Sequence, residues 1–357
     1  MKIILENNLL SKGNIMQRVV SLAIASFMLL FSWNLPAHAA AKYLFKIASL
    51  APTGSVWIEQ FKSFGKEVAE KTGGEVVFRV YAGGVMGDDQ AMYRKMRIRQ
   101  LHGGGFTMTG ISAVVPDFRV MAIPFFFETY EEVDYVKNGL IPVFTERFRE
   151  KGLEFIAMTE VGFVYAMSTK PIASFDDLRK STNWSPTGDP ISETYLVSLG
   201  ITPVQLSIPD VLSSLQSGLI DTAYNSLYGS IIMQWFTKAK YLVDTPYGYA
   251  YGAFVLDSKA FAKLPEKYQQ ILHTAAKTHF AILLKNTRKS NFDSRKVLKE
   301  HGAEFLQADA QTLKILREKR DLTIDKLIPD SFSQDIYDRE KTLLEEYRKS
   351  TAGGKTN

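Results

Sequence analysis

The chain has 357 residues, no cysteine and a formal charge of +5 at neutral pH. The absence of cysteine excludes disulfides, thiolate chemistry and lipid attachment through a cysteine. Lysine and arginine are scattered rather than gathered in a stripe with aromatic residues, which argues against nucleic-acid binding. A hydrophobic content of 46% at this length is typical of a globular protein with room for two lobes.

The N-terminus has the pattern of a secretory signal peptide. Lys12 and Arg18 supply positive charge, residues 19–33 are almost wholly apolar, and residues 37–39 form a small-x-small cleavage site. The apolar run is shorter than the roughly 20 residues of a spanning helix, and an uncleaved membrane anchor is the alternative. We therefore expect a cleaved signal peptide over residues 1–39 and a periplasmic location.

Strand and helix patterns alternate from residue 43 onward, which favours parallel sheets with right-handed crossovers. Helix-capping residues and glycines mark the expected helix ends. The expected strands are residues 43–48, 75–81, 106–109, 153–159, 163–168, 202–206, 222–225, 249–256 and 302–306. The expected helices begin at Ser55, Asp88, Ser174, Ile191 and Val211, the last of them ends at Gly218, and the chain is mostly helical after Pro265.

No catalytic or metal-binding pattern is found in the sequence. The histidines lack metal-ligand spacing, and the glycines at 103–105 lack the neighbours of a phosphate loop. Paired acids at 88–89 and 176–177 fall at expected helix starts, where a carboxylate offsets the helix dipole. We therefore expect a binding protein and not an enzyme, with no cofactor and no metal.

Several segments, in order along the chain, resemble the DctP-type substrate-binding proteins of TRAP transporters. Asn225 also falls where the family's Q-E-N-P segment has its asparagine, and the similarity runs from about residue 43 to near residue 340. The segments are 45–49 (FKIAS), 81–89 (YAGGVMGDD), 122–127 (AIPFFF), 170–178 (KPIASFDDL) and 211–221 (VLSSLQSGLID).

The resemblance implies an α/β, two-lobed periplasmic binding protein fold with mostly parallel sheets, a hinge and a long C-terminal helical region. It implies hinge closure on a small-molecule ligand. It also implies delivery of the ligand to paired small and large integral membrane transporter subunits, driven by an ion gradient. The expected boundaries are 40–162 and 250–290 for lobe I, 163–249 and 291–350 for lobe II, and 351–357 for a tail.

Two arginines with which the family holds a ligand carboxylate are absent at the matching positions, which carry Trp184 and Val164. A desolvated carboxylate without a partner costs several kcal/mol, and neither side chain replaces the bidentate fork of arginine. Tryptophan offers a flat apolar face, one N–H donor and attraction for cations. We expect a neutral, aromatic or largely apolar ligand, or a cationic one, stacked on Trp184 and oriented by Asn225 and a tyrosine hydroxyl.

The candidate ligand-binding residues combine this position with neighbouring aromatic and polar groups. Thr107 and Gly110 follow a strand whose carboxyl end faces the expected cleft. The carboxylates of Asp189 and Glu160 can pair with a cation or accept from a ligand hydroxyl. The full set is Trp184, Asn225, Tyr224, Phe163, Val164, Tyr165, Tyr228, Trp57, Thr107, Gly110, Asp189 and Glu160.

Other interpretations are open. Trp184 and the aromatic residues can be core packing instead of a site. An acidic ligand can be held by an arginine from another loop, for which Arg79, Arg94 and Arg119 are the candidates. The loaded protein can serve as a sensor component, or deliver its ligand to an ABC-type partner. A periplasmic hydrolase on a similar scaffold is the enzymatic alternative.

Overall fold

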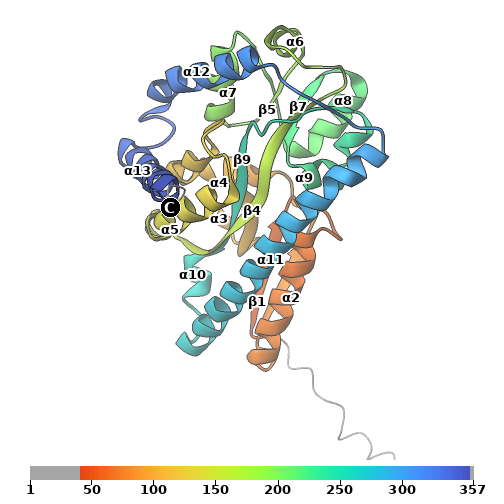
Figure 1. Cartoon of the computed structure of the whole chain (residues 1–357). Helices are drawn as coiled ribbons and strands as arrows, with labels where there is room; N and C mark the ends of the chain where they lie inside the picture. Colours follow the sequence, from red (N-terminus) through yellow and green to blue (C-terminus); the bar gives the residue numbers. More distant parts are fainter. Residues whose placement is uncertain (1–40, 354–357) are drawn as a thin grey trace, which may run out of the picture. The chain divides into compact units, whose positions relative to one another are not determined.

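The computed structural model describes residues 41–353, so the expected signal peptide and residues 354–357 lie outside the described part. Two long strands, β4 (Leu153–Ser168) and β9 (Gly248–Asp257), pair antiparallel at the centre of an eight-stranded sheet (Figure 1). The other strands of this sheet are β1 (Tyr43–Ser49), β2 (Val76–Tyr81), β3 (Gly103–Thr107), β7 (Thr222–Asn225), β8 (Tyr241–Val243) and β10 (Glu304–Leu306). A separate pair is formed by β5 (Trp184–Pro186) and β6 (Val204–Leu206).

We call lobe I the part built on β1, β2 and β3, and lobe II the part built on β5 to β8 and β10. Lobe I carries α2 (Val56–Lys71), α3 (Asp89–Arg97), α4 (Met108–Ser112), η2 (Pro116–Ala122), α5 (Tyr130–Glu150) and α10 (Ser258–Phe261). Lobe II carries α6 (Phe175–Lys180), α7 (Pro190–Ser198), η3 (Ile208–Asp210), α8 (Val211–Ser217), α9 (Leu227–Ile232), η4 (Trp235–Thr237) and α12 (Ala310–Leu327). Strands β4 and β9 belong to both lobes.

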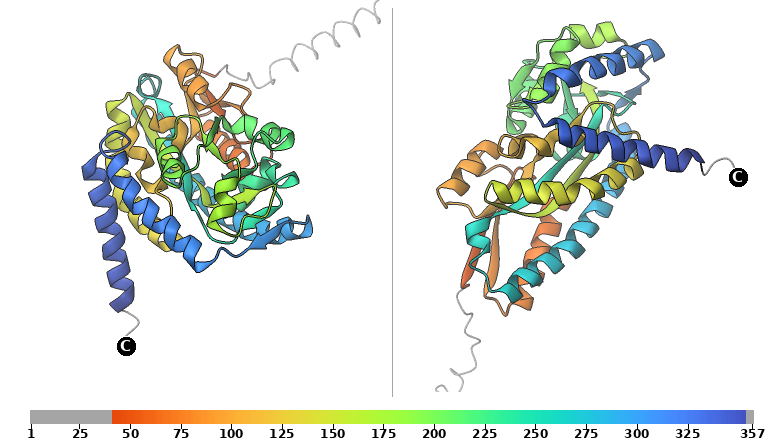
Figure 2. Two further views of the ribbon diagram at one scale, coloured as in Figure 1. Left: turned by 90° about the horizontal axis from the view of Figure 1, so that it is seen from above. Right: turned by 90° about the vertical axis from the view of Figure 1, so that its left-hand side faces the viewer.

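The helix α11 (Glu266–Glu300) links the lobes. It has 35 residues, which makes it about 52 Å long at 1.5 Å per residue. It packs on α2 in lobe I, on β4 in the middle and on α9 in lobe II. The last helix, α13 (Gln334–Gly353), lies along α5 and η2 of lobe I (Figure 2). The expected boundaries of lobe II and of the tail differ from this arrangement, since α13 packs on lobe I and continues to Gly353.

Local sequence signals account for most helix ends. The Ser55 hydroxyl accepts a hydrogen bond from the Ile58 N–H at the start of α2, as its N-cap position requires. Ser174 and Asp177 form a reciprocal capping box at α6. Gly218 ends α8 with φ of 77°, a conformation that favours glycine. The predicted starts and ends of these helices are confirmed.

The strands differ from expectation in two places. The segments 153–159 and 163–168 form the single strand β4, whose register against β9 shifts at Phe155/Ala157 and at Glu160/Gly162. The glycines at 103–105 are part of β3, which ends at Thr107, and α4 follows at once. Glycine is needed here because a Cβ on Gly103 would lie 2.4 Å from the Val255 carbonyl oxygen.

The sheet is mixed, which refines the expected mostly parallel arrangement. Pairs within each lobe, such as β1 with β2 and β8 with β10, are parallel. Pairs that involve the two crossing strands β4 and β9 are antiparallel. Among residues 41–353, no helix combines the length and the apolar character that crossing a bilayer requires.

The first prediction concerns two glycines of β9. A Cβ on Gly252 would lie 2.1 Å from the Phe106 carbonyl oxygen, whereas the nearest atom to a Cβ on Gly248 is 3.9 Å away. Gly252→Ala should therefore lower the free energy of unfolding by about 1–3 kcal/mol, the usual cost of overpacking. Gly248→Ala should change it by less than about 0.5 kcal/mol, as measured by urea unfolding. Equal effects of the two substitutions would contradict the close packing of β3 against β9.

Candidate ligand-binding site

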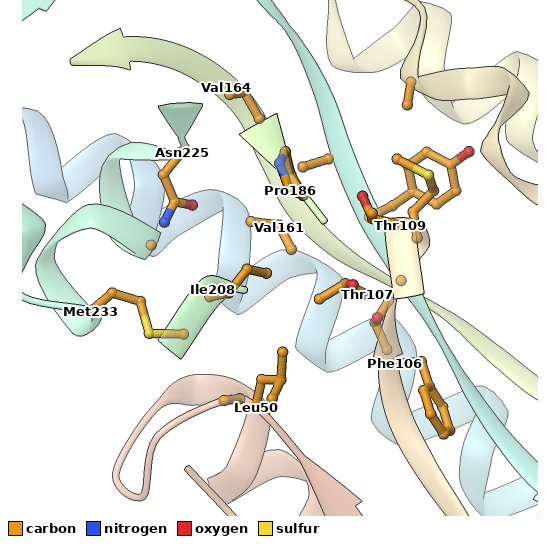
Figure 3. Close-up of a pocket in the computed structure, with 18 of the residues that line it drawn as sticks. Leu50, Phe106, Thr107, Thr109, Val161, Val164, Pro186, Ile208, Asn225 and Met233 are labelled. Atoms are coloured by element: carbon orange, nitrogen blue, oxygen red, sulfur yellow. The ribbon is translucent and has the colours of Figure 1, made fainter. Parts of the chain in front are cut away.

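A cavity of about 230 Å³ lies between the lobes, with walls from both and from the crossing strands. Leu50, which follows β1, lies on one side, and Asn225 and Met233 lie on another (Figure 3). The apolar lining includes Leu50, Phe106, Met108, Val161, Val164, Pro186, Ile208 and Met233. The polar lining includes Ser49, Thr107, Thr109, Thr159, Asp189, Ser192 and Asn225.

The carboxyl end of β3 supplies the lobe I wall. Thr107 is the N-cap of α4, where its hydroxyl oxygen accepts from the Gly110 N–H at 3.1 Å. The same hydroxyl donates to Asp89 Oδ2 at 2.5 Å, and the Thr107 N–H donates to Asp89 Oδ1 at 3.2 Å. Thr107 therefore lines the cavity with its hydroxyl already engaged on both sides. Thr109 lies two residues further on and also lines the cavity (Figure 3).

Asp89 is a buried carboxyl directly behind this wall. Burial raises its pKa from 3.8 to about 7, and the two hydrogen bonds from Thr107 offset only part of that effect. Gly110 does not line the cavity but makes room for this group, because a Cβ on Gly110 would lie 2.0 Å from the Asp89 Cβ. Both acids lie at a helix start, as predicted: Asp88 caps α3 and Asp89 is its first residue, with its buried carboxyl bound to Thr107.

Asn225 supplies a polar group on the lobe II side, at the end of β7. Its Oδ1 accepts from the Ser226 N–H at 2.8 Å. Within residues 41–353 no hydrogen bond of its amide N–H groups is recorded, so they are available to a ligand. Gly229 is required beside it, because a Cβ there would lie 2.2 Å from Asn225 Oδ1.

Trp184 lines the cavity but is only 3% exposed. Its Nε1–H donates to the Leu206 carbonyl oxygen at 3.0 Å, because β5 and β6 lie side by side. Its ring packs edge-on against Trp235 with 5.4 Å between centroids. Trp184 is thus held as a wall residue of the lobe II core, and its N–H donor is engaged. These contacts support the core interpretation of Trp184 over the stacking platform.

The cavity lining described here contains no lysine, arginine or histidine, and Asp189 is its one carboxyl group. Asp189 caps α7 and accepts from the Ser192 hydroxyl at 2.6 Å. Burial raises its pKa, and the hydrogen bond from Ser192 and the charge of Arg119 offset this only in part. The lining therefore offers a ligand no positive charge.

The arginines considered as replacements do not line the cavity either. Arg79 and Arg94 are exposed, the first on β2 and the second on α3. Arg119 is 6% exposed in η2 and lies near Asp189 and Tyr251, both of which line the cavity. Burial lowers the pKa of Arg119, and the Asp189 charge opposes that shift. Arg119 therefore lies behind residues that line the cavity and is not part of the lining itself.

The remaining expected residues divide between the wall and its support. Trp57, Val164 and Tyr224 line the cavity, together with Thr107, Trp184, Asp189 and Asn225. Phe163 is 8% exposed and packs on Tyr130 and Tyr249 in the lobe I core. Tyr165, Tyr228 and Glu160, like Gly110, lie outside the lining.

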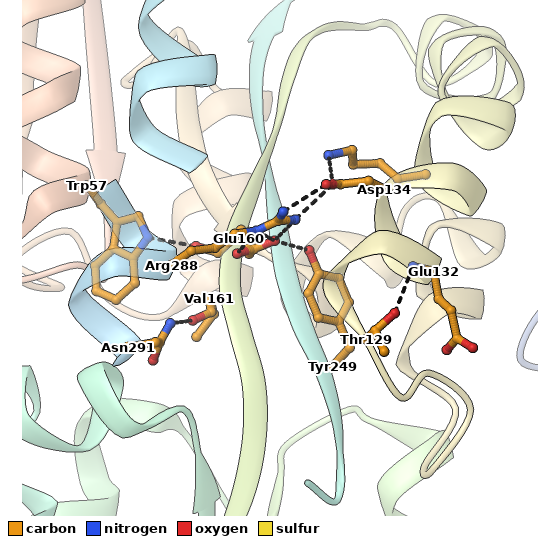
Figure 4. Close-up of polar contacts among 10 residues, drawn as sticks. Trp57, Thr129, Glu132, Asp134, Glu160, Val161, Tyr249, Arg288 and Asn291 are labelled. Carbon is orange, nitrogen blue, oxygen red and sulfur yellow. Dashed lines mark hydrogen bonds and ion pairs between the residues drawn. The ribbon is translucent and has the colours of Figure 1, made fainter. Parts of the chain in front are cut away.

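Glu160 is part of a buried ion network at the middle of β4 (Figure 4). Its carboxylate accepts from Arg288 Nη2 at 2.9 Å and from the Tyr249 hydroxyl at 2.9 Å. Arg288, on α11, also donates to both carboxylate oxygens of Asp134 on α5, at 2.7 and 2.8 Å. Burial lowers the pKa of Arg288, but the hydrogen bonds to Asp134 and Glu160 more than reverse this and raise it. The network fixes β4 between α5 and α11.

The bulge after Glu160 leaves two backbone carbonyl oxygens free, and two side chains donate hydrogen bonds to them. Trp57 Nε1–H donates to the Glu160 carbonyl at 2.8 Å, and Asn291 Nδ2 donates to the Val161 carbonyl at 2.9 Å (Figure 4). Asn291 Oδ1 accepts from the Tyr228 N–H, and the Tyr228 hydroxyl accepts from the Val56 N–H at 3.0 Å. Tyr228 of lobe II thus joins the start of α2 in lobe I, so its role is to link the lobes.

Several lining residues were not predicted. Leu50 follows the end of β1, a position that could have indicated it. Met233 and Trp235 lie beyond α9 and carry no sequence signal of a site. Within residues 41–353 no group of acidic, histidine or cysteine side chains could hold a metal ion.

Comparison with known proteins places this geometry in a family. Residues 47–329 match the DctP family, described as "Bacterial extracellular solute-binding protein, family 7". A "Solute-binding protein" of Verminephrobacter eiseniae is 25% identical over 60% of this chain and 64% of its own length. The matched region therefore spans less than two thirds of that relative.

Solved structures share the fold at low sequence identity. A TRAP periplasmic solute-binding protein from Desulfovibrio salexigens with bound orotic acid has a TM-score of 0.79 and 20% identity, over 86% of this chain and 99% of that one. One from Xanthobacter autotrophicus with bound β-D-galacturonate has a TM-score of 0.78 and 18% identity, over 84% and 99%. The resemblance drawn from the motifs, the two-lobed fold and the prediction of a binding protein instead of an enzyme are confirmed.

The second prediction concerns Asp89. Its folded pKa of about 7 lies above the ordinary 3.8, so the folded state holds the proton more tightly and loses stability as pH rises between these values. Asp89→Asn cannot ionise. The free energy of unfolding of wild type relative to Asp89→Asn should therefore fall by a few kcal/mol between pH 4 and about pH 7. Asp88→Asn, at the neighbouring helix cap, is the control. A constant difference across this range, measured by urea unfolding, would show that Asp89 ionises freely.

Proposed function

Because the chain belongs to the DctP family of bacterial extracellular solute-binding proteins, we propose that it captures a small, uncharged, aromatic or largely apolar molecule in the periplasm. The loaded protein delivers this molecule to a TRAP-type secondary transporter formed by paired small and large integral membrane subunits. Residues 1–39 direct export and are then removed. The lobe boundaries expected from the sequence belong to the same proposal, with α13 reassigned to lobe I. The observation that carries the ligand class is the absence of lysine and arginine from the described cavity lining.

The electrostatics of the cavity favour an uncharged ligand. A carboxylate that leaves water loses several kcal/mol of hydration free energy, which a cavity returns only through a cation or several donors. The uncommitted donors on these walls are few and neutral, such as the Asn225 amide and the Thr109 hydroxyl. Asp189, the one carboxyl group of this lining, supplies no positive charge. An uncharged ligand avoids this penalty, and it gains from the apolar walls in proportion to the apolar area that it buries.

The ligands of similar proteins differ from the ligand class proposed for this chain. The two similar structures described above hold orotic acid and β-D-galacturonate, and both of these ligands are acids. In this chain Trp184 and Val164 stand where the family motif has arginine. The carboxylate alternative requires an arginine to enter the cavity, and Arg119 is buried outside the described lining. We therefore favour the uncharged ligand.

Ligand-induced stabilisation tests the proposal. Protein comprising residues 40–357 is heated with neutral aromatic compounds, sterol-like and lipid-like compounds, amines and simple carboxylates in parallel. A ligand at a hundredfold excess over its dissociation constant stabilises the folded state by about 2.7 kcal/mol, which shifts the midpoint clearly. We expect shifts with uncharged aromatic or apolar compounds. Shifts with carboxylates alone would overturn the proposed ligand class.

The third prediction concerns a substitution that adds a positive charge to the cavity wall. Val164 lines the cavity and is 9% exposed, so Val164→Arg should place a guanidinium at the cavity wall. This variant should bind benzoate at least tenfold more tightly than wild type, because the anion gains a charged donor. Val164→Met, similar in length and uncharged, is the matched control and should show no gain. Calorimetric titration with benzoate measures both. Tight benzoate binding by wild type would show that a cation already reaches the cavity.

A further inference from the structure

A second, smaller cavity of about 40 Å³ adjoins the first inside lobe II. Most of its lining is apolar and comes from the α6 region, α7, β4 and α12. Tyr224 and Tyr247 line both cavities, so their rings form the partition between the two spaces. The apolar lining residues include Phe125, Ala166, Ile172, Leu178, Leu199, Val243, Leu313 and Leu316. A space of this size accepts about three water-sized groups.

The two partition residues are held differently. The Tyr224 hydroxyl donates to Asn183 Oδ1 at 2.6 Å, which fixes its ring. The Tyr247 hydroxyl is buried and has no hydrogen-bond partner among residues 41–353, although Ser192 lies close to it. Such a group costs free energy where it stands, and turning it away gives up only the contact with Ser192.

The main chain of Tyr247 is nevertheless fixed. Its N–H donates to the Val164 carbonyl at 2.6 Å, and its carbonyl accepts from the Phe125 N–H at 2.8 Å. The ring is held by packing alone, against Tyr224 at 4.7 Å and Tyr195 at 5.7 Å between centroids and against the apolar cluster that includes Leu316. A rotation about the side-chain bonds of Tyr247 can therefore open the partition while the strand behind it stays in place.

From this geometry we propose that Tyr247 is a gate, and that the second cavity is a subsite for an apolar extension of the ligand. The inference rests on the proposed function and narrows its ligand class to uncharged molecules with a head group in the central cavity and a short alkyl tail. The tail displaces the Tyr247 ring and enters the space in front of Leu316 and Leu313. Tyr224 remains as the fixed side of the opening.

The size of the subsite sets the expected dependence on chain length. Each methylene that is taken out of water improves affinity by about three- to fourfold. With room for about three groups, affinity should rise over the first two or three added carbon atoms and then level off.

The test uses the neutral esters of 4-hydroxybenzoic acid from methyl to octyl, titrated by calorimetry. We expect wild type to bind the propyl or butyl ester at least tenfold more tightly than the methyl ester. Leu316→Phe should abolish this gain and leave methyl ester binding within about twofold of wild type, because the phenyl ring fills the subsite. Tyr247→Ala should extend the gain to longer esters. Tyr247→Phe, which keeps the ring, should retain the dependence of affinity on chain length.

The outcomes separate the two proposals. If the methyl ester binds but chain length has no effect, or if Leu316→Phe keeps the full gain, the subsite is wrong and the proposed ligand class stands. If no ester binds and benzoate or another carboxylate does, the proposed ligand class is wrong and the subsite inference falls with it. Affinity that rises with chain length in wild type, and is flat in Leu316→Phe, supports both.

Discussion

The clamp of Arg288 on the middle of β4 is the interaction on which the rest of the structure depends. Glu160 is only 3% exposed, and a carboxylate so placed is tolerated only with a charged partner and satisfied oxygens. Arg288 meets that need and binds Asp134 as well, so that one side chain joins α5, α11 and the crossing strand. The adjacent bulge, at Val161, leaves the Glu160 and Val161 carbonyls free for Trp57 and Asn291. The Arg288 network thus makes the middle of β4 rigid, and the hydrogen bonds of Trp57 and Asn291 link it to both lobes.

This arrangement also determines the character of the cavity. The arginines near the crossing strands are committed to structural partners, Arg288 to Glu160 and Arg295 to Asp244. Arg119 is buried behind the wall near Asp189. These arginines are thus engaged elsewhere, and the described cavity lining contains no lysine or arginine. A cavity of this kind discriminates by desolvation: an anion loses its hydration without compensation, whereas an apolar molecule gains from every surface that it covers.

The sequence was informative where a local signal decides the structure. Helix caps such as Ser55 and Gly218 follow from backbone chemistry, and the ordered family motifs predicted the fold before any coordinates. Strand ends placed Thr107 near the cavity for the same reason. Long-range packing escaped such reasoning. The continuity of β4 depends on a bulge that is stabilised by α11, and the engagement of Trp184 depends on β6, a strand separated from it by a helix. The aromatic composition around the site suggested stacking on Trp184, whereas tertiary contacts hold that ring in the wall.

The most direct test of a cavity without positive charge is a calorimetric comparison of a neutral ligand with an anionic one of similar size. Methyl 4-hydroxybenzoate and the 4-hydroxybenzoate anion share the ring and the hydroxyl, and they differ in charge and in one methyl group, whose burial alone accounts for about fourfold in affinity. We expect the ester to bind at least tenfold more tightly than the anion at neutral pH. Tighter binding of the anion would mean that a cationic group enters the cavity when the lobes close, and it would contradict the central claim.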